Sequence, residues 1–346
     1  MRSFLRPAAG LTCLFALATA GCSAGSDGTP DAAPAAPEQT SASPSESASE
    51  SASPGTSYEP YVSATEANDN DSAGSPTTYN LAFVISDGSS CTPKWNGTEA
   101  IGDSAVKSRI SQLTKSGARV RVSFGGASGK ELASVCDSAS ELADAYGEAL
   151  DAAGATQADF DIEGTRLTDS DSVALRSEAI AQLQQDRPDL EVSFTLPVMP
   201  SGLDSDSVAL LESANKYDVQ VSVVNIMTMN YGESYTADMG DYALTSAKAT
   251  HTQLKDVFGL SDETAWRGMA LTSMIGVNDI DNETFSLSDA AQVRTFAEEN
   301  EIAWVSMWST FRDQQCEDDE ASQDDAATNC SGVEQSSGAF AKAFTG

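Results

Sequence analysis

Histidine and basic side chains are scarce in this sequence. Among its 346 residues His251 is the only histidine, and 19 Lys and Arg stand against 52 Asp and Glu, which gives a formal net charge of −33. One histidine cannot supply both a serine-type triad and a multi-histidine metal site, so Ser-His-Asp hydrolysis and zinc proteolysis are disfavoured. The negative charge repels phosphate backbones and disfavours nucleic-acid binding. We therefore expect chemistry carried out by carboxylates, with no cofactor and no metal ion.

Cysteine is sparse as well, with six residues in the chain and no Cys-x-x-Cys spacing, which argues against metal and redox sites. Four of them, Cys91, Cys136, Cys316 and Cys330, follow the N-terminal region. An even number of cysteines in an exported protein indicates structural disulfides, and four cysteines allow three pairings. We predict that Cys316 pairs with Cys330, which closes a short polar loop, and that Cys91 pairs with Cys136.

The N-terminus has the pattern of a targeting signal. Arg2 and Arg6 precede an apolar stretch from about Pro7 to Ala20, which is too short to span a bilayer but suits a signal-peptide core. Cleavage after Ala18-Thr19-Ala20 would give ordinary secretion. Ala20-Gly21-Cys22 instead fits a bacterial lipobox, in which Cys22 is lipidated. We favour a lipoprotein anchored at the cell surface, with free secretion as the alternative.

The composition predicts three segments. Residues 1–21 would be the signal peptide, and residues 22–57 are rich in Ser, Ala, Pro and Glu, with too little apolar surface to fold, which predicts a disordered tether. Residues 58–346 contain no internal repeat and no second linker. We expect them to form a single catalytic domain and the protein to be a monomer.

The folded part alternates apolar strand patterns with helical patterns. Eight strands in about 290 residues match the count and size of a (β/α)8 TIM barrel, an α/β fold. The link over Thr65–Thr78 is polar and shows no helical period, which leaves a doubly wound open sheet as the alternative. The predicted strands are Tyr58–Ala64, Asn80–Ser86, Ala118–Phe124, Ala158–Glu163, Glu191–Val198, Gln220–Asn230, Gly268–Ile275 and Ile302–Ser309.

The fourth predicted strand carries the most specific signal in the chain. Because side chains alternate along a strand, Asp159, Asp161 and Glu163 lie on one face, with Glu163 outermost at the mouth of the barrel. Carboxylates this close repel one another, which raises the pKa of one group and favours a shared proton, as a general acid requires. The alternative is an edge strand with its acids in water. A central parallel strand is buried on both faces and leaves its acids no solvent, which favours the catalytic interpretation.

These residues and several others resemble the motifs of family 18 glycoside hydrolases, the chitinase group. The family's fourth strand carries Asp-x-x-Asp-x-Asp-x-Glu, and this chain supplies the last three acids, with Thr156 in the first place. Many relatives also have an aspartate beside the tyrosine of the sixth strand, where this chain has Asn230 and Gly232. The resemblance extends from about Tyr58 to near Phe344. Its other matches are Ser123, Gly125 and Gly126 on the third strand, Met229 and Tyr231 on the sixth, and Trp308 on the eighth.

The resemblance implies a substrate-assisted, retaining hydrolysis of β-1,4-linked N-acetylglucosamine polymers, in which the 2-acetamido oxygen is the nucleophile. Glu163 would be the acid and base, and Asp161 would orient the acetamido N–H. Tyr231 would bind the acetamido oxygen, and Asp159 would share the proton of Asp161. Trp308 would form the apolar floor under the sugar. Further substrate contacts are expected from Met229, Asn230 and Trp95, although Trp95 packing over Cys91 is an equal alternative.

Three functional classes remain compatible with the sequence. The first is hydrolysis of chitin or N-acetylglucosamine oligosaccharides, which we favour. The second is a chitinase-like lectin without catalysis, which the presence of Glu163 disfavours. The third is an endo-glycosidase acting on another acetamido glycan.

Overall fold

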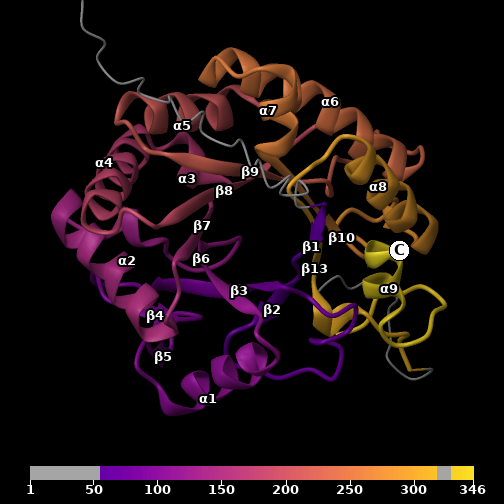
Figure 1. Ribbon diagram of the computed structural model, residues 1–346, viewed down its shortest axis with the longest axis horizontal. Helices are drawn as coiled ribbons and strands as arrows, with labels where there is room; N and C mark the ends of the chain where they lie inside the picture. Colours follow the sequence, from indigo (N-terminus) through magenta and orange to yellow (C-terminus); the bar gives the residue numbers. More distant parts are fainter. Residues whose placement is uncertain (1–54, 318–328) are drawn as a thin grey trace, which may run out of the picture. The chain divides into compact units, whose positions relative to one another are not determined.

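The computed structural model describes residues 55–317 and 329–346, and these form a ring of strands surrounded by helices (Figure 1). Cys22, the predicted signal peptide and nearly all of the predicted tether lie outside the described residues. Thr56 is already buried and Ser57 lies in the first strand, so the folded domain begins slightly before the predicted boundary at residue 58. Within the described part of the chain, no helix is both long and apolar enough to cross a membrane.

All eight predicted strands are present, and each is parallel to its neighbours in the ring. Their order around the ring is β13-β10-β9-β8-β7-β6-β3, with β1 and β2 between the two ends. The predicted TIM-barrel class is confirmed. The strands are β1 (Ser57–Tyr58), β2 (Tyr61–Ser63), β3 (Thr78–Ser86), β6 (Arg119–Gly125), β7 (Gln157–Asp161), β8 (Glu191–Pro197), β9 (Val221–Met227), β10 (Met269–Met274) and β13 (Trp304–Trp308).

The first barrel strand is interrupted, so the ring has a seam. β1 pairs only with β13 and β2 pairs only with β3, and Glu59-Pro60 joins the two halves. A proline has no N–H to donate to a ladder, which explains a break at this point. Main-chain hydrogen bonds from Glu59 to Val305 (3.0 Å) and from Asn80 to Pro60 (2.9 Å) hold the seam. Two short strands therefore occupy the place of one continuous first strand, and the strand ladder is not closed between them.

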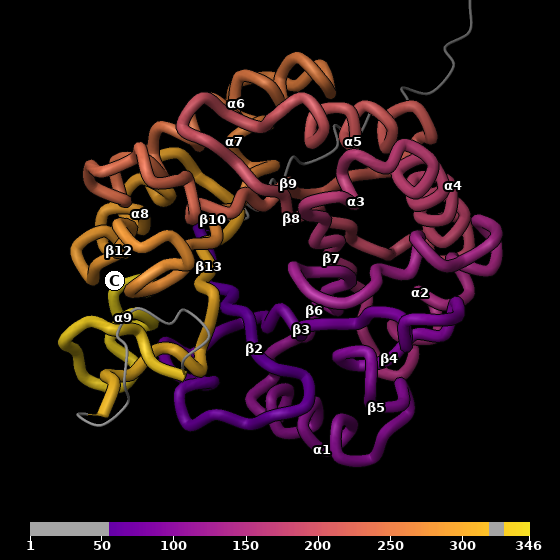
Figure 2. Tube along the Cα trace, turned by 180° about the vertical axis from the view of Figure 1, so that it is seen from behind, coloured from indigo at the N-terminus to yellow at the C-terminus, as the bar shows by residue number. Residues whose placement is uncertain are grey.

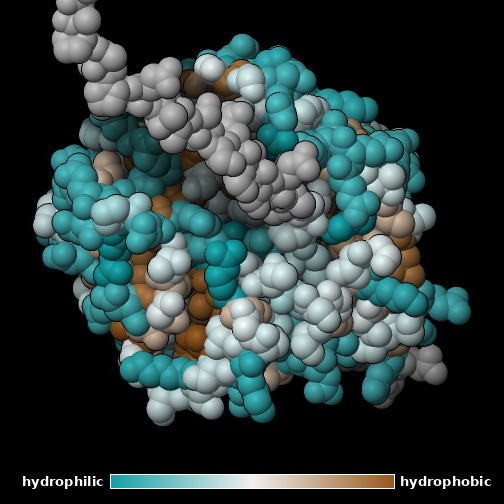
Figure 3. Space-filling view, in the orientation of Figure 1, coloured by the Kyte–Doolittle hydropathy of each residue, from teal (hydrophilic) through white to brown (hydrophobic). Residues whose placement is uncertain are grey.

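Helices cover the outside of the ring in both views (Figures 1 and 2). Most of them begin after an Asp or Ser whose side chain accepts a backbone N–H, as at Asp103, Ser138 and Asp238, and a carboxylate there also complements the helix dipole. On the face of the molecule drawn in Figure 3, hydrophilic residues are more common than hydrophobic ones. The helices are α1 (Ser104–Leu113), α2 (Ala139–Ala153), α3 (Thr165–Thr168), α4 (Ser170–Asp186), α5 (Ser205–Lys216), α6 (Met239–Phe258), α7 (Asp262–Arg267), α8 (Leu287–Glu299) and α9 (Ala339–Thr345).

Short antiparallel elements extend the barrel at two places. β4 (Pro93–Trp95) and β5 (Glu99–Ala100) continue from the edge of β3, and β11 (Gly276–Val277) pairs with β12 (Thr284–Phe285). Residues 55–317 and 329–346 also contain three short 3-10 helices, η1 (Thr114–Ser116), η2 (Leu132–Ser134) and η3 (Thr310–Arg312).

The expectation that Trp95 contacts substrate is wrong. β4 folds back on β3, so Trp95 is completely buried and its indole N–H donates to the carbonyl oxygen of Ile101 at 3.1 Å. Trp95 is therefore a core residue, and its indole N–H is already bonded within the protein rather than free for a sugar.

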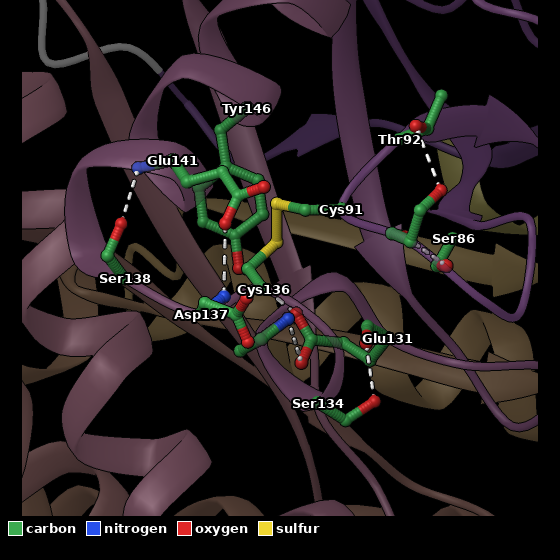
Figure 4. Close-up of a disulfide and its surroundings, with 12 residues drawn as sticks. Ser86, Cys91, Thr92, Glu131, Ser134, Cys136, Asp137, Ser138, Glu141 and Tyr146 are labelled. Carbon is green, nitrogen blue, oxygen red and sulfur yellow. Dashed lines mark hydrogen bonds between the residues drawn. A yellow bond between two sulfur atoms is a disulfide. The ribbon is translucent and has the colours of Figure 1, made fainter.

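Both predicted disulfides are present. Cys91–Cys136 joins the segment before β4 to the segment between η2 and α2, with 4.6 Å between the Cα atoms (Figure 4). Cys316–Cys330 joins residues on either side of 318–328, with 5.0 Å between the Cα atoms. The two bonds join loop segments that are distant in sequence.

Candidate active site

A layer of hydroxyl groups surrounds the first acid of β7 inside the barrel. The register places Ser123 of β6 and Ser193 of β8 beside Asp159, so all three side chains project at the same level. Asp159 Oδ2 accepts hydrogen bonds from Ser123 (2.6 Å) and Tyr61 (3.0 Å). Its Oδ1 accepts from Thr195 (2.7 Å) and Ser193 (3.0 Å). Four donors on two oxygens is the arrangement that an ionised, buried carboxylate needs.

Asp161 and Glu163 follow Asp159 toward the mouth of the barrel, Glu163 lying just beyond the end of β7. Burial raises the pKa of Asp161 well above its usual range, and the nearby negative charges of Glu163 and Asp159 raise it further. Burial also raises the pKa of Glu163, a hydrogen bond from Asp161 opposes this effect, and the charge of Asp279 adds to it. Asp161 therefore holds the proton of this pair and donates it toward Glu163.

The two glycines after Phe124 fix the backbone of Asp161. Gly125 has a φ of +100°, and a Cβ at this position would lie 2.1 Å from the carbonyl oxygen of Asp161. Gly126 donates its N–H to the same oxygen at 2.9 Å. Only glycine allows this close approach of β6 to β7, which gives the Ser-x-Gly-Gly pattern a physical role beside the acids.

A cavity of about 500 Å³ opens above these acids. Asp161, Glu163, Asp204 and Asp279 line it, and no Lys or Arg of the described residues does. Its aromatic wall is formed by Trp308, which stacks on Phe83 (ring centroids 5.6 Å apart) and meets Tyr61 edge-on at 5.8 Å. A flat apolar wall facing carboxylates suits a sugar ring, which has an apolar face and polar substituents.

Of the predicted substrate contacts, Trp308, Met229 and Asn230 line this cavity. The placement expected for Tyr231 is wrong. Its hydroxyl accepts a hydrogen bond from Ser246 of α6 at 3.4 Å, and its ring packs against Tyr235 and Tyr242 instead of lining the cavity. β9 ends at Met227, and Asn230 has a φ of +56°, so strand alternation no longer decides which side chains point inward.

Sequence reasoning missed several polar residues that complete the site. Tyr61 and Thr195 bind Asp159, and Asn225 of β9 donates to Thr195 at 3.0 Å. Asp279 lies in the cavity wall. Polar side chains inside otherwise apolar strands were the available signal for the first three. Among the described residues, no group of three or more His, Cys, Asp or Glu side chains is arranged to hold a metal ion.

Comparison with known proteins gives consistent relatives, although no family model matches the chain. Over 275 residues the chain is 33% identical to a probable bifunctional chitinase/lysozyme of Escherichia coli, covering 74% of this chain and 31% of that protein. It is 32% identical over 275 residues to Endochitinase 11 of Metarhizium anisopliae, covering 74% of this chain and 52% of that protein. The chain thus spans about a third of the length of the first of these curated relatives and about half of the length of the second.

Solved structures that resemble this chain are also chitinases. The catalytic domain of a hyperthermophilic chitinase from Pyrococcus furiosus is 29% identical, with a TM-score of 0.73, over 84% of this chain and 94% of that one. A GH18 chitinase from Pseudoalteromonas aurantia, at 15% identity and a TM-score of 0.54 over 73% of this chain and 94% of that one, shares the fold. Together with the acids of β7 and the aromatic wall of the cavity, these relatives show that the folded part of this chain belongs to the chitinase-like group of glycoside hydrolase family 18.

Proposed function

We propose that this protein hydrolyses β-1,4-linked N-acetylglucosamine polymers, either chitin or chito-oligosaccharides. The observation that carries the proposal is the Asp161–Glu163 pair, which lies in a cavity walled by Trp308 with the pKa of both carboxyl groups raised. The relatives named chitinase support the same substrate class.

The proposed mechanism needs one acid and the substrate's own acetamido group. Asp161 first passes its proton to Glu163. Glu163 then protonates the glycosidic oxygen as the bond from C1 breaks, and the acetamido carbonyl oxygen forms a bond to C1, which gives an oxazolinium ion. Glu163 then removes a proton from water, the water oxygen bonds to C1, and the ring opens to the acetamide with retention at C1. The ionised Asp161 accepts a hydrogen bond from the acetamido N–H, and its negative charge balances the positive charge of the oxazolinium ion. Its Oδ1 is buried and has no hydrogen-bond partner among the described residues, which leaves an acceptor for that N–H.

Asp159 acts from below this pair. Its charge favours the protonated form of Asp161, so a proton is available to the pair before substrate binds. With four hydroxyl donors in place, Asp159 has the role of a fixed negative charge in this proposal.

The test is turnover of N-acetylglucosamine oligomers by the wild type and by Glu163→Gln. We expect the variant to lose activity by about 10²–10⁴-fold and to keep oligosaccharide binding. Glu148→Gln, an exposed glutamate on α2 outside the cavity, is the matched control and should be fully active. Retained turnover in purified Glu163→Gln would contradict the assignment. Binding without turnover in the wild type would instead indicate a lectin.

Partially acetylated chitosan tests the nucleophile. The sugar on the non-reducing side of the cut must keep its acetyl group, so every new reducing end should be N-acetylglucosamine, and a thiazoline mimic of the cyclised intermediate should inhibit. New reducing ends with free glucosamine would reveal a protein nucleophile. Other acetamido glycans, including peptidoglycan because one relative is named chitinase/lysozyme, belong in the same assay.

We also propose that Cys22 carries a lipid anchor and that the domain acts as a monomer at the cell surface. Wild-type protein should partition with membranes, and Cys22→Ala should not. Recovery of soluble wild-type protein cleaved after Ala20 would favour free secretion.

A further inference from the structure

Two loops meet at the wall of the cavity through a pair of hydrogen bonds between Asn230 and Asp279. Asn230, after β9, donates from Nδ2 to Asp279 Oδ2 at 2.6 Å. Asp279, after β11, donates its backbone N–H to Asn230 Oδ1 at 3.0 Å. Each residue thus fixes the other, and the amide is oriented by the carboxylate, because only its nitrogen can donate to that oxygen.

Glu283 also links the loop after β9 to the loop after β11. Its side chain is completely buried, and its Oε1 accepts the N–H of Gly232 at 2.7 Å. Burial raises its pKa, while N–H groups from Gly232, Asn230 and Tyr231 lower it. Within its own loop Glu283 donates its N–H to Ile280 and accepts from Asn278. The backbone that carries Asn230 is therefore tied to the loop that carries Asp279.

The side chains of Asn230 and Asp279 are accessible from the cavity. Asn230 and Asp279 are both exposed and both line the cavity that contains Glu163. Among the described residues, Asp279 Oδ1 and the second N–H of Asn230 have no hydrogen-bond partner. The pair presents one donor and one acceptor, side by side and at fixed orientation, which suits the hydroxyl or amide groups of a sugar.

We propose that Asn230 and Asp279 act as one recognition unit for the sugar bound next to Glu163. Asn230 donates to a substrate oxygen and Asp279 accepts from a substrate hydroxyl or N–H, at the wall from which Tyr231 is turned away. This inference rests on the proposed hydrolysis of N-acetylglucosamine polymers. Because the two side chains fix each other, removing either one releases the other.

The test compares Asn230→Gly, Asp279→Asn and the double variant on chito-oligosaccharides. Glycine keeps the left-handed backbone of residue 230 without strain, so only the side chain is lost. Asn282→Ala is the matched control, since Asn282 also joins these two loops, through a 2.7 Å bond from Nδ2 to the carbonyl of Tyr235, and it does not line the cavity.

We expect each single variant to lower kcat/KM by about tenfold to a hundredfold, as for loss of a hydrogen bond to a charged group, and Asn282→Ala to stay within about twofold. The double variant should be no worse than the poorer single variant, because the two residues act as a unit. Asp279→Asn should also move the alkaline limb of the pH profile to lower pH, since it removes a negative charge that favours protonated Glu163. The other titratable groups lining the cavity, Asp161, Asp204 and Tyr61, are unchanged in that variant.

The outcomes separate the two proposals. If the wild type does not cleave the oligosaccharide, the proposed function fails. If the wild type cleaves it and the single variants match Asn282→Ala, or the losses simply add in the double variant, the recognition unit is refuted while the function stands.

Discussion

Gly125→Ala gives the sharpest test of how the fold positions the acids. The added methyl group would lie 2.1 Å from the carbonyl oxygen of Asp161, about 0.9 Å short of the 3.0 Å below which real Cβ contacts essentially never occur. The obstacle is backbone rather than a flexible side chain, so either β6 or the segment carrying Asp161 must move by about that distance. A misplacement of about 1 Å at a reacting group can lower a rate by about 10²-fold. We expect a loss of kcat of this size.

The same substitution also strains the backbone, since the φ of Gly125 is +100°. Gly154→Ala separates the two effects, because Gly154 ends α2 with a φ of +63° and has nothing within 4 Å of an added Cβ. It should lose about 1–2 kcal/mol of stability and no activity. Initial rates on a chito-oligosaccharide and thermal unfolding of both variants provide the assay. A folded Gly125→Ala with the kcat of Gly154→Ala would refute the reasoning.

Three further predictions follow from the site and its supports. A carboxyl group whose pKa is raised by folding destabilises the fold once the pH exceeds its pKa in the unfolded chain. Asp161→Asn should therefore raise the Tm by a few degrees at pH 7, and this gain should vanish below about pH 4. A variant whose Tm equals that of the wild type at both pH values would contradict this. Tyr231→Phe should keep activity, because the Tyr231 hydroxyl is hydrogen-bonded to Ser246 and does not line the cavity. Trp308→Ala should raise KM for oligosaccharides by about tenfold or more, because Trp308 forms the aromatic wall. A larger loss for Tyr231→Phe than for Trp308→Ala would overturn the cavity assignment. Arg176→Met leaves Glu131 buried without its 2.7 Å partner and should cost about 3–5 kcal/mol in urea unfolding. Arg267→Gln, which breaks an exposed pair, is the control and should cost far less.

The sequence predicted the strands well because parallel barrel strands are buried on both faces and read as continuous apolar runs. β8, expected over Glu191–Val198 and found over Glu191–Pro197, is typical. The acids of β7 were found for the opposite reason, since three carboxylates in such a run have no structural explanation.

Prediction failed where the chain leaves regular structure. Tyr231 was assigned to the cavity from its place in the family motif. Asn230 adopts a left-handed conformation just before it, and Tyr231 packs against α6 instead. The pairing of Asn230 with Asp279 joins residues 49 positions apart, and no local pattern encodes such a contact. Trp95 was misplaced because its burial depends on β4 folding back on β3, which the sequence did not indicate.

The seam at Glu59-Pro60 has a kinetic consequence. β1 pairs with β13 across about 246 positions, as in the main-chain bond from Ser57 to Ala303, so the first strand finds its second partner only when the last strand has been made. Until then β1 and β10, the two strands that pair with β13, each present an unpaired edge, which is open to association with other chains. Contacts this distant in sequence slow folding and make its final step cooperative over the whole domain. The seam therefore makes the last strand the one that completes the ring, and it exposes a half-made barrel to aggregation for as long as that strand is missing.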